Sequence, residues 1–292
     1  MLRVSLLLLF LAQVELSIEP PELRIEAPAQ LAVARMQLES FDRKQLGDVM
    51  RLAGLRTPGP PIRVQLAAES SESAEKVPSW IAGFALAASD TVVLFPSRSP
   101  SYPDRSLDDV LRHEVAHILI FRASNHQPLP RWFNEGLAMS AEREWKFRDQ
   151  TRLFYELVSG SRETLDTLDR LFQGTQADQT RAYLLSGALV RGLLKEHGET
   201  AAGRILENVA RGTSFESAFT NVIGRSPDAA EVEFWETQRV WTSWIPILFS
   251  QEVLWMAITI LALVAIQRRR RRSAEIEKRW EEEEKTDQET RT

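Results

Sequence analysis

The stretch LRHEVAHILI (111–120) constrains this chain most, because it places two of the four histidines four positions apart. Residues four apart in an α-helix lie on the same face, so His113 and His117 can direct two imidazoles at one metal ion. Glu114 is turned by about 100° from His113 and is placed to reach a water on that metal. The pattern predicts a metal-binding catalytic helix. The alternative is a buried helix that contains two histidines by chance.

The composition limits which groups can complete such a site. The 292 residues include no cysteine, so disulfides, thiolate ligands and a cysteine nucleophile are excluded. Any metal must be held by histidine, aspartate or glutamate. Hydrophobic residues make up 43% and charged residues 26%, as in globular proteins. The net charge of −5 lacks the basic surplus of a nucleic-acid-binding surface, so we expect no nucleic-acid partner.

A catalytic zinc site needs a third protein ligand and keeps one position for water. Glu135 in LPRWFNEGLAMS (129–140) is the candidate. The stretch after His117 ends the first helix, turns through two prolines and begins a second helix, so it can bring Glu135 back beside the histidine pair. Gly136 and Ala138 are small and allow that second helix to approach closely.

The other two histidines are given no role in the site. His126 falls in the loop between the two helices, where exposure to solvent is the simpler interpretation. His197 precedes Gly198 at a predicted helix end, where a cation interacts favourably with the helix dipole.

Residues 24–240 are interpreted as one α+β domain, in which a small sheet precedes a helical part. Ser106 and Asp109 form an acidic capping box, which starts the histidine helix near Leu107. Gly54 is a predicted helix stop, and Ser89-Asp90 a predicted turn between two strands. The expected helices cover 31–54, 107–123, 131–147, 181–198, 200–212 and 214–224, and the expected strands lie at 62–67 and in the two halves of 79–97.

Both ends carry apolar segments typical of membrane proteins. Segment 1–17 has one basic residue before a leucine-rich run, which predicts a secretory signal peptide; the alternative is a first buried helix. Segment 245–267 is long enough to cross a bilayer, and five arginines follow it. The positive-inside rule keeps those arginines in the cytoplasm. We expect a C-terminal transmembrane helix and a basic-then-acidic cytoplasmic tail at 268–292; the alternative is a buried or partner-binding helix.

These motifs resemble the gluzincin metallopeptidases, in particular the bacterial peptidase MA-like domains. The resemblance rests on HEVAH (113–117) and LPRWFNEGLA (129–138), continues more weakly through 181–198 and 214–224, and covers roughly 60–240. It implies a zincin-like α+β fold with a small, mostly antiparallel sheet. It also implies one zinc ion held by His113, His117 and Glu135, with Glu114 as general base and proton shuttle.

The resemblance further implies that the substrate backbone pairs with an edge strand above the zinc helix. IAGFALA (81–87) is the matching segment, so Gly83, Phe84 and Ala85 are candidate substrate-binding residues. Tyr183 is the candidate for stabilising the oxyanion, and a core tyrosine is the alternative.

Two departures from the family pattern matter. GFALA lacks the glutamate with which gluzincin aminopeptidases hold the substrate amine, which favours an endopeptidase. Met139 stands where some gluzincins have an aspartate that supports a ligand. Another group must therefore orient the histidine, or the site is held less rigidly.

The sequence thus predicts a membrane-anchored zinc peptidase that acts on peptides or proteins. Its domain is expected outside the bacterial cytoplasmic membrane and its C-terminus in the cytoplasm. The alternative is a non-catalytic, zinc-stabilised binding or assembly protein on the membrane. The presence of Glu114 argues against that alternative, because a purely structural site needs no base.

Overall fold

The computed structural model describes residues 18–100, 102–142, 147–158, 164–248, 255–256 and 258–269. The signal peptide predicted at 1–17 and most of the tail predicted at 268–292 lie outside these residues. The chain divides into two compact units, Met1–Trp235 and Glu236–Thr292, and each is described by itself.

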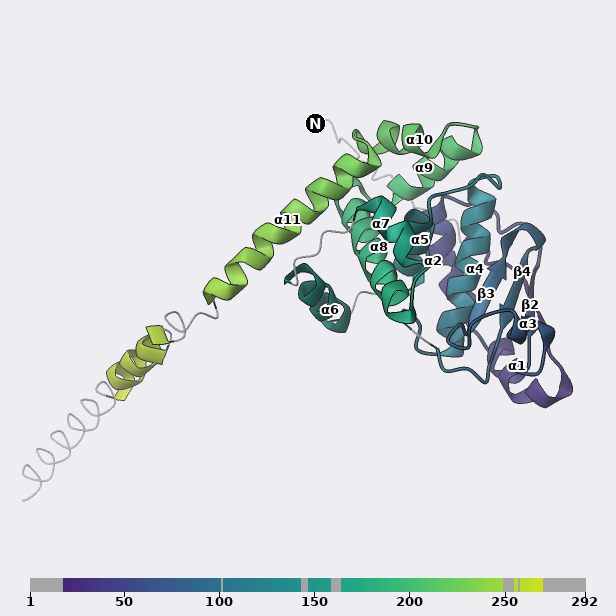
Figure 1. Ribbon diagram of the computed structural model, residues 1–292, viewed down its shortest axis with the longest axis horizontal. Coiled ribbons are helices and arrows are strands. Elements are labelled where there is room, and N and C mark those ends of the chain that lie inside the picture. Colours follow the sequence, from purple (N-terminus) through teal and green to yellow (C-terminus); the bar gives the residue numbers. More distant parts are fainter. Residues whose placement is uncertain are drawn as a thin grey trace, which may run out of the picture. The chain divides into compact units, whose positions relative to one another are not determined.

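A four-stranded sheet lies on one side of the first unit, in the order β1-β2-β4-β3 (Figure 1). The fold is mixed α+β and rich in helix, as expected. β1 pairs with β2 and β2 with β4 in parallel, and only β3 runs antiparallel, against β4. The expectation of a mostly antiparallel sheet is therefore wrong. The strands are Leu23–Glu26 (β1), Ile62–Leu66 (β2), Gly83–Leu86 (β3) and Thr91–Leu94 (β4).

The connections between strands explain this pairing. Helices α1 (Ala32–Glu39) and α2 (Leu46–Ala53) lie between β1 and β2, and a parallel pair needs such a crossover. Helix α3 (Glu72–Glu75) and β3 lie between β2 and β4. β3 and β4 are joined by the turn predicted at Ser89-Asp90, where Asp90 has a φ of 49°. That short turn makes them a hairpin.

The stretch 31–54, predicted as one helical segment, forms two helices. A 3-10 turn at Arg43–Gln45 separates α1 from α2, and the Asp42 side chain accepts a hydrogen bond from the Lys44 N–H at its start. Gly54 ends α2 as predicted, with a φ of +75° that glycine adopts without steric cost. β1 was not predicted, because four residues of alternating exposure are too short a signal.

Helix α4 (Leu107–Ala123) occupies the middle of the first unit (Figure 1). It packs on β3 and β4 on one side and on α2 and α5 (Arg131–Glu142) on the other. The Ser106 side chain accepts a hydrogen bond from the Asp109 N–H at 3.1 Å, so the helix begins where predicted. Because elements pack on both sides of α4, its polar residues His113 and Glu114 are buried.

A helical part follows α5, as expected. α5 packs along α8. A Cβ on Gly136 would lie 2.5 Å from both Ser186 O and Val190 Cγ2, so only glycine permits this approach. The predicted helix ends at Gly198 and Gly224 are confirmed, whereas α6, α7 and α11 were not predicted. The helices after α5 are α6 (Phe147–Val158), α7 (Leu165–Leu171), α8 (Gln176–His197), α9 (Thr200–Ala210), α10 (Phe215–Ile223) and α11 (Pro227–Leu248).

The second unit contains the last part of α11 and the helical residues 255–256 and 258–269. The large apolar side chains described between Trp255 and Ile266 are exposed. Part of the membrane span predicted at 245–267 lies outside the described residues. Of the helices that the structure describes, none combines the length and the apolar content needed to cross a bilayer.

Candidate metal centre

Helix α4 carries His113 and His117 on one face, and α5 brings Glu135 against them. The two Nε2 atoms lie 3.2 Å apart. Glu135 Oε2 lies 3.5 Å from His113 Nε2 and 3.2 Å from His117 Nε2. One nitrogen or oxygen from each residue falls within 4.8 Å of the other two. The structure therefore brings together the three residues predicted as ligands.

This donor set fits a divalent metal ion. Two imidazole nitrogens and a carboxylate oxygen are ligands that zinc accepts, and a three-residue set leaves positions open for water. His113 and Glu135 are buried, and His117 is half-buried. A buried carboxylate is costly unless it is paired or bound to a cation, so the enclosure itself favours a bound ion.

The pKa shifts within the cluster also favour a bound cation. Burial acts to raise the pKa of Glu135, but His117 and His113 more than offset it, so the pKa lies well below its usual range. Burial acts to lower the pKa of His117, yet the Glu135 carboxylate raises it above the ordinary value. The cluster thus holds an ionised carboxylate and attracts positive charge.

Glu114 lies beside these residues on α4 and is buried. Its carboxyl accepts a hydrogen bond from the backbone N–H of Ala85 in β3. Burial raises the pKa of Glu114, although the two histidines and this hydrogen bond act to lower it. A carboxyl group with a raised pKa can both accept and return a proton nearer to neutral pH.

Asn134 is the residue that sequence reasoning missed. Its Oδ1 lies 3.0 Å from His117 Nδ1 and can accept a hydrogen bond from the ring N–H. That bond directs the other ring nitrogen, Nε2, at the cluster. Its place directly before Glu135 on the same helix was the available signal. Met139 is buried instead against α8, where a Cβ on Gly187 would lie 3.1 Å from its sulfur.

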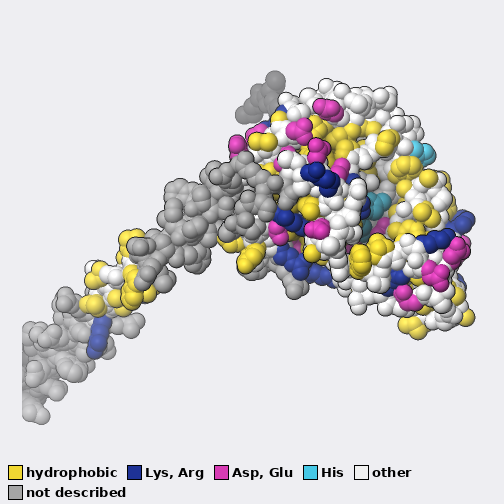
Figure 2. Space-filling view, in the orientation of Figure 1, with side chains coloured by type: hydrophobic (Ala, Val, Ile, Leu, Met, Phe, Trp, Pro, Cys, Tyr) yellow, Lys and Arg dark blue, Asp and Glu magenta, His cyan; other side chains and the backbone are white. Residues whose placement is uncertain are grey.

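A cavity of about 480 Å³ opens beside the cluster, and Figure 2 shows histidine in a hollow of the surface. Gly83, Phe84 and Ala85 of β3 line this cavity. Phe95 N donates to Ala82 O, so the antiparallel ladder turns the backbone groups of Gly83 and Ala85 away from β4. β3 is an edge strand, as expected, and its outer side can take up another strand.

Tyr183 of α8 also lines the cavity. Its ring contacts that of His113 edge-on, with centroids 6.1 Å apart, and contacts Phe172 at 5.2 Å. Burial raises the pKa of Tyr183 well above its ordinary value, and the Glu135 and Glu114 carboxylates add to the effect. Its hydroxyl therefore keeps its proton and remains a hydrogen-bond donor.

The two remaining histidines do not line the cavity. His126 is exposed in the loop after α4, where its ring stacks on Phe121 with centroids 4.7 Å apart. His197 ends α8, and its Nε2 lies 3.4 Å from a carboxylate oxygen of Glu196. Neither joins the cluster, in agreement with the sequence.

The class of protein follows from this arrangement: an HExxH helix, a carboxylate from the next helix and an open edge strand together form a metallopeptidase domain. A family model of the peptidase MA superfamily matches residues 58–241. The chain belongs to the peptidase MA superfamily, which confirms the resemblance to peptidase MA-like domains. The match spans every candidate site residue. No curated protein matches the chain.

Proposed function

We propose that this protein is a zinc-dependent peptidase, anchored in the membrane, that cleaves within peptide chains. The observation that carries the proposal is the convergence of His113, His117 and Glu135 within 4.8 Å, beside the buried Glu114. Membership of the peptidase MA superfamily supports peptide-bond hydrolysis as the reaction. Three nitrogen and oxygen ligands with open positions favour zinc.

In this proposal metal binding, proton transfer and stabilisation of the oxyanion belong to different residues. His113, His117 and Glu135 hold one divalent ion, which when bound acidifies a water and polarises the substrate carbonyl. Glu114 accepts the proton from the attacking water and returns it to the leaving amine. The Tyr183 hydroxyl donates a hydrogen bond to the oxygen on which negative charge develops.

The substrate lies as an added strand along β3, where the outward backbone groups of Gly83 and the carbonyl of Ala85 bind it. β3 carries no acidic side chain that could hold a free amine, which supports endopeptidase action. Asp104 does line the cavity, from the segment before α4, and it favours an aminopeptidase as the second candidate.

Peptides with free and acetylated N-termini separate the two candidates. We expect the purified chain to cleave both forms at internal bonds, to lose activity with a chelator and to recover it with zinc. Cleavage confined to free N-termini would favour the aminopeptidase. Bound zinc without any cleavage would favour the non-catalytic binding or assembly protein.

We also propose that residues 245–267 anchor the chain, with the peptidase domain outside the bacterial cytoplasmic membrane and a signal peptide at 1–17. The exposed apolar side chains between Trp255 and Ile266, followed by Arg268 and Arg269, support an anchor. Membrane fractionation of the chain with and without 245–292 tests this. The anchor is wrong if both forms appear in the soluble fraction.

A further inference from the structure

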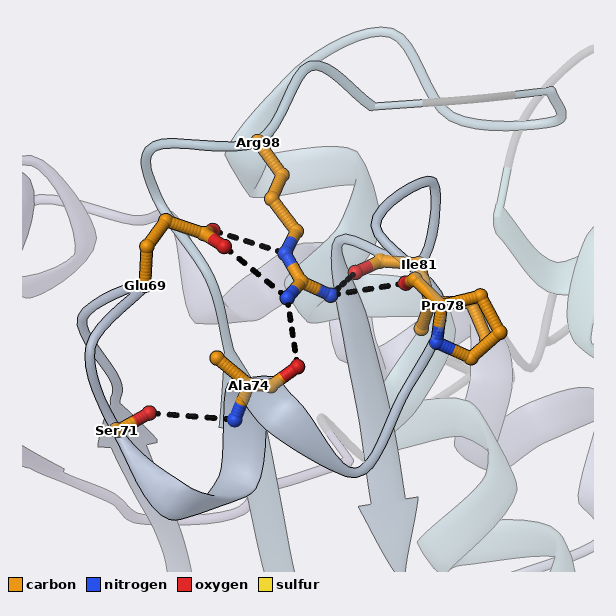
Figure 3. A network of polar contacts seen from close by, with 6 residues as sticks. All are labelled: Glu69, Ser71, Ala74, Pro78, Ile81 and Arg98. Atoms are coloured by element: carbon orange, nitrogen blue, oxygen red, sulfur yellow. Dashed lines mark hydrogen bonds and ion pairs between the residues drawn. The ribbon is translucent and has the colours of Figure 1, made fainter.

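A polar cluster outside the metal centre surrounds the buried side chain of Arg98 (Figure 3). Arg98 lies in the turn after β4, where its backbone N–H donates to Phe95 O at 3.0 Å. Its side chain is only 6% exposed, and its guanidinium carbon lies 4.2 Å from the centroid of the Phe95 ring. Burying a guanidinium is costly unless its hydrogen bonds are satisfied. The hydrogen-bond acceptors around the Arg98 guanidinium therefore indicate its structural role.

All five N–H donors of the Arg98 guanidinium have an acceptor (Figure 3). Nε and Nη2 donate to the two carboxylate oxygens of Glu69, at 2.8 Å and 3.1 Å. Nη1 donates to the carbonyls of Pro78 and Ile81, at 3.0 Å and 2.9 Å. Nη2 also donates to the Ala74 carbonyl, at 3.1 Å. One side chain thus binds four points along the segment that joins β2 to β3.

That segment forms a wall of the catalytic cavity. Trp80, Ile81 and Ala82 line the cavity directly before β3 begins. The regular structure of the segment is the single turn α3, so its backbone conformation depends on side-chain contacts. Arg98 binds the Ile81 carbonyl, and Phe95 N donates to the next carbonyl, that of Ala82, at 2.8 Å. These two hydrogen bonds join the residues directly before β3 to the residues directly after β4.

The apolar side of the same cluster reaches β3 as well. Phe95 and Val93 of the β4 region and Ala74 of α3 are buried together, and Phe84 of β3 packs against them. The Phe84 and Phe95 rings lie 6.0 Å apart. The Arg98 guanidinium thus lies over Phe95, and Phe95 packs against Phe84, which lines the cavity.

We propose that Arg98 is a positioning residue for substrate binding. It fixes the segment 69–82, so that Trp80, Ile81 and Ala82 hold the cavity wall in place beside the edge of β3 that binds a peptide in extended conformation. The inference rests on the proposed peptidase function of the cavity. It assigns Arg98 to peptide affinity, while His113, Glu114, His117 and Glu135 account for metal binding and the chemical step.

Arginine is required at this position rather than lysine. Lysine has three donors on one nitrogen, so it cannot reach acceptors on opposite sides of a planar fork. Arg98→Lys keeps the charge and leaves at least two of the five acceptors unbound. Glu69→Gln is a milder variant, because it loses the ion pair and keeps the three carbonyl contacts.

Arg122 provides a matched control. Its side chain is 9% exposed and its Nη2 lies 2.8 Å from Asp90 Oδ1, and it also donates to the carbonyls of Pro58 and Pro60. It is thus a buried arginine that binds one carboxylate and loop carbonyls, yet it does not line the cavity. Arg122→Lys should lower thermal stability as Arg98→Lys does and leave peptide affinity unchanged.

The test compares the wild-type 292-residue chain with Arg98→Lys, Glu69→Gln and Arg122→Lys. We expect KM for a quenched fluorescent peptide to rise roughly tenfold in Arg98→Lys, with kcat changed by no more than about twofold and zinc content unchanged. Glu69→Gln should raise KM less. Backbone amide exchange over 80–86 should accelerate in Arg98→Lys and not in Arg122→Lys.

Two results would overturn the proposal: unchanged KM and unchanged exchange in Arg98→Lys, or an equal rise of KM in both lysine variants. If the wild-type chain binds zinc but cleaves no peptide, the proposed function fails by itself. Amide exchange over 80–86 then still decides whether Arg98 fixes this wall.

Discussion

At the scale of single residues, burial and neighbouring charge shift the pKa values of two glutamates of one site in opposite directions. Burial dominates at Glu114 and raises its pKa. At Glu135 burial acts in the same direction, but the two histidines outweigh it and the pKa falls. The first carboxyl is therefore suited to exchange protons and the second to remain an anionic ligand.

The raised pKa of Glu114 gives activity a pH dependence. Glu114 must be ionised to accept a proton, so activity is lost as pH falls through its pKa. Because burial raises that pKa, we expect the acidic limb of kcat/KM to have its midpoint above the ordinary value of 4.5. A profile of kcat/KM against pH measures it, and a limb centred at or below 4.5 would contradict the assignment.

Asn134 should affect the metal through His117. Asn134→Ala removes the acceptor for the ring N–H, and loss of such a partner typically weakens metal affinity about 10- to 100-fold. Asn134→Asp keeps an acceptor and should retain most of the affinity. Competition for zinc with a chromophoric chelator measures both variants. Equal affinity in wild type and Asn134→Ala would show that Asn134 does not orient the ring.

At the scale of elements, the site is the meeting point of α4, α5 and β3. α4 contributes two ligands and the base, α5 the third ligand and its orienting neighbour, and β3 the substrate edge. The contact of α5 with α8 fixes where α5 lies, and Gly136 makes that contact possible. A residue without a side chain thus controls the position of Glu135.

Gly136→Ala should lower both stability and zinc affinity. Its Cβ would lie 2.5 Å from atoms of α8, and overpacking of this kind typically costs about 1–3 kcal/mol in the free energy of unfolding. Gly47→Ala in α2 is the control, because nothing lies within 4 Å of its added Cβ. That change should stabilise α2 by about 0.5 kcal/mol. Urea unfolding that ranks the two variants equally would exclude the close contact.

The sequence predicts the elements around the site from local signals. Ser106 caps α4, Gly54 and Gly198 end α2 and α8, and the i, i+4 histidines share a face. These features could be predicted because each depends on residues within a few positions of one another. The strand directions could not be predicted in this way, since pairing joins residues far apart in sequence. The contact between Asn134 and His117 was missed because the direction of the Asn134 side chain depends on how α5 packs against α4.

At the scale of the whole molecule, the described core of the first unit includes polar groups where it borders the cavity. His113, Glu114 and Glu135 are buried among the apolar side chains that join the sheet to the helices. Burying such groups opposes folding unless a cation or hydrogen bonds compensate them. Metal binding and folding of this unit are therefore linked.

This linkage predicts that zinc stabilises the folded chain. A ligand that binds only the folded state adds about 4 kcal/mol at a thousandfold excess over its Kd. We expect zinc to raise the Tm of the metal-free chain and a chelator to reverse the rise. His113→Ala should abolish the shift, whereas His126→Ala should preserve it, because His126 lies outside the cluster. A zinc-dependent rise that survives in His113→Ala would place the metal elsewhere.

The central claim is that Glu114 acts as the base of a peptidase, and Glu114→Gln tests it most directly. The side chain keeps its size and stays beside the ligands, but it can no longer accept a proton. We predict wild-type zinc content and Tm in this variant, with a loss of peptide cleavage to background on a broad peptide library. If the purified wild-type chain binds zinc and Glu114→Gln cleaves that library at the same rate, the account is contradicted.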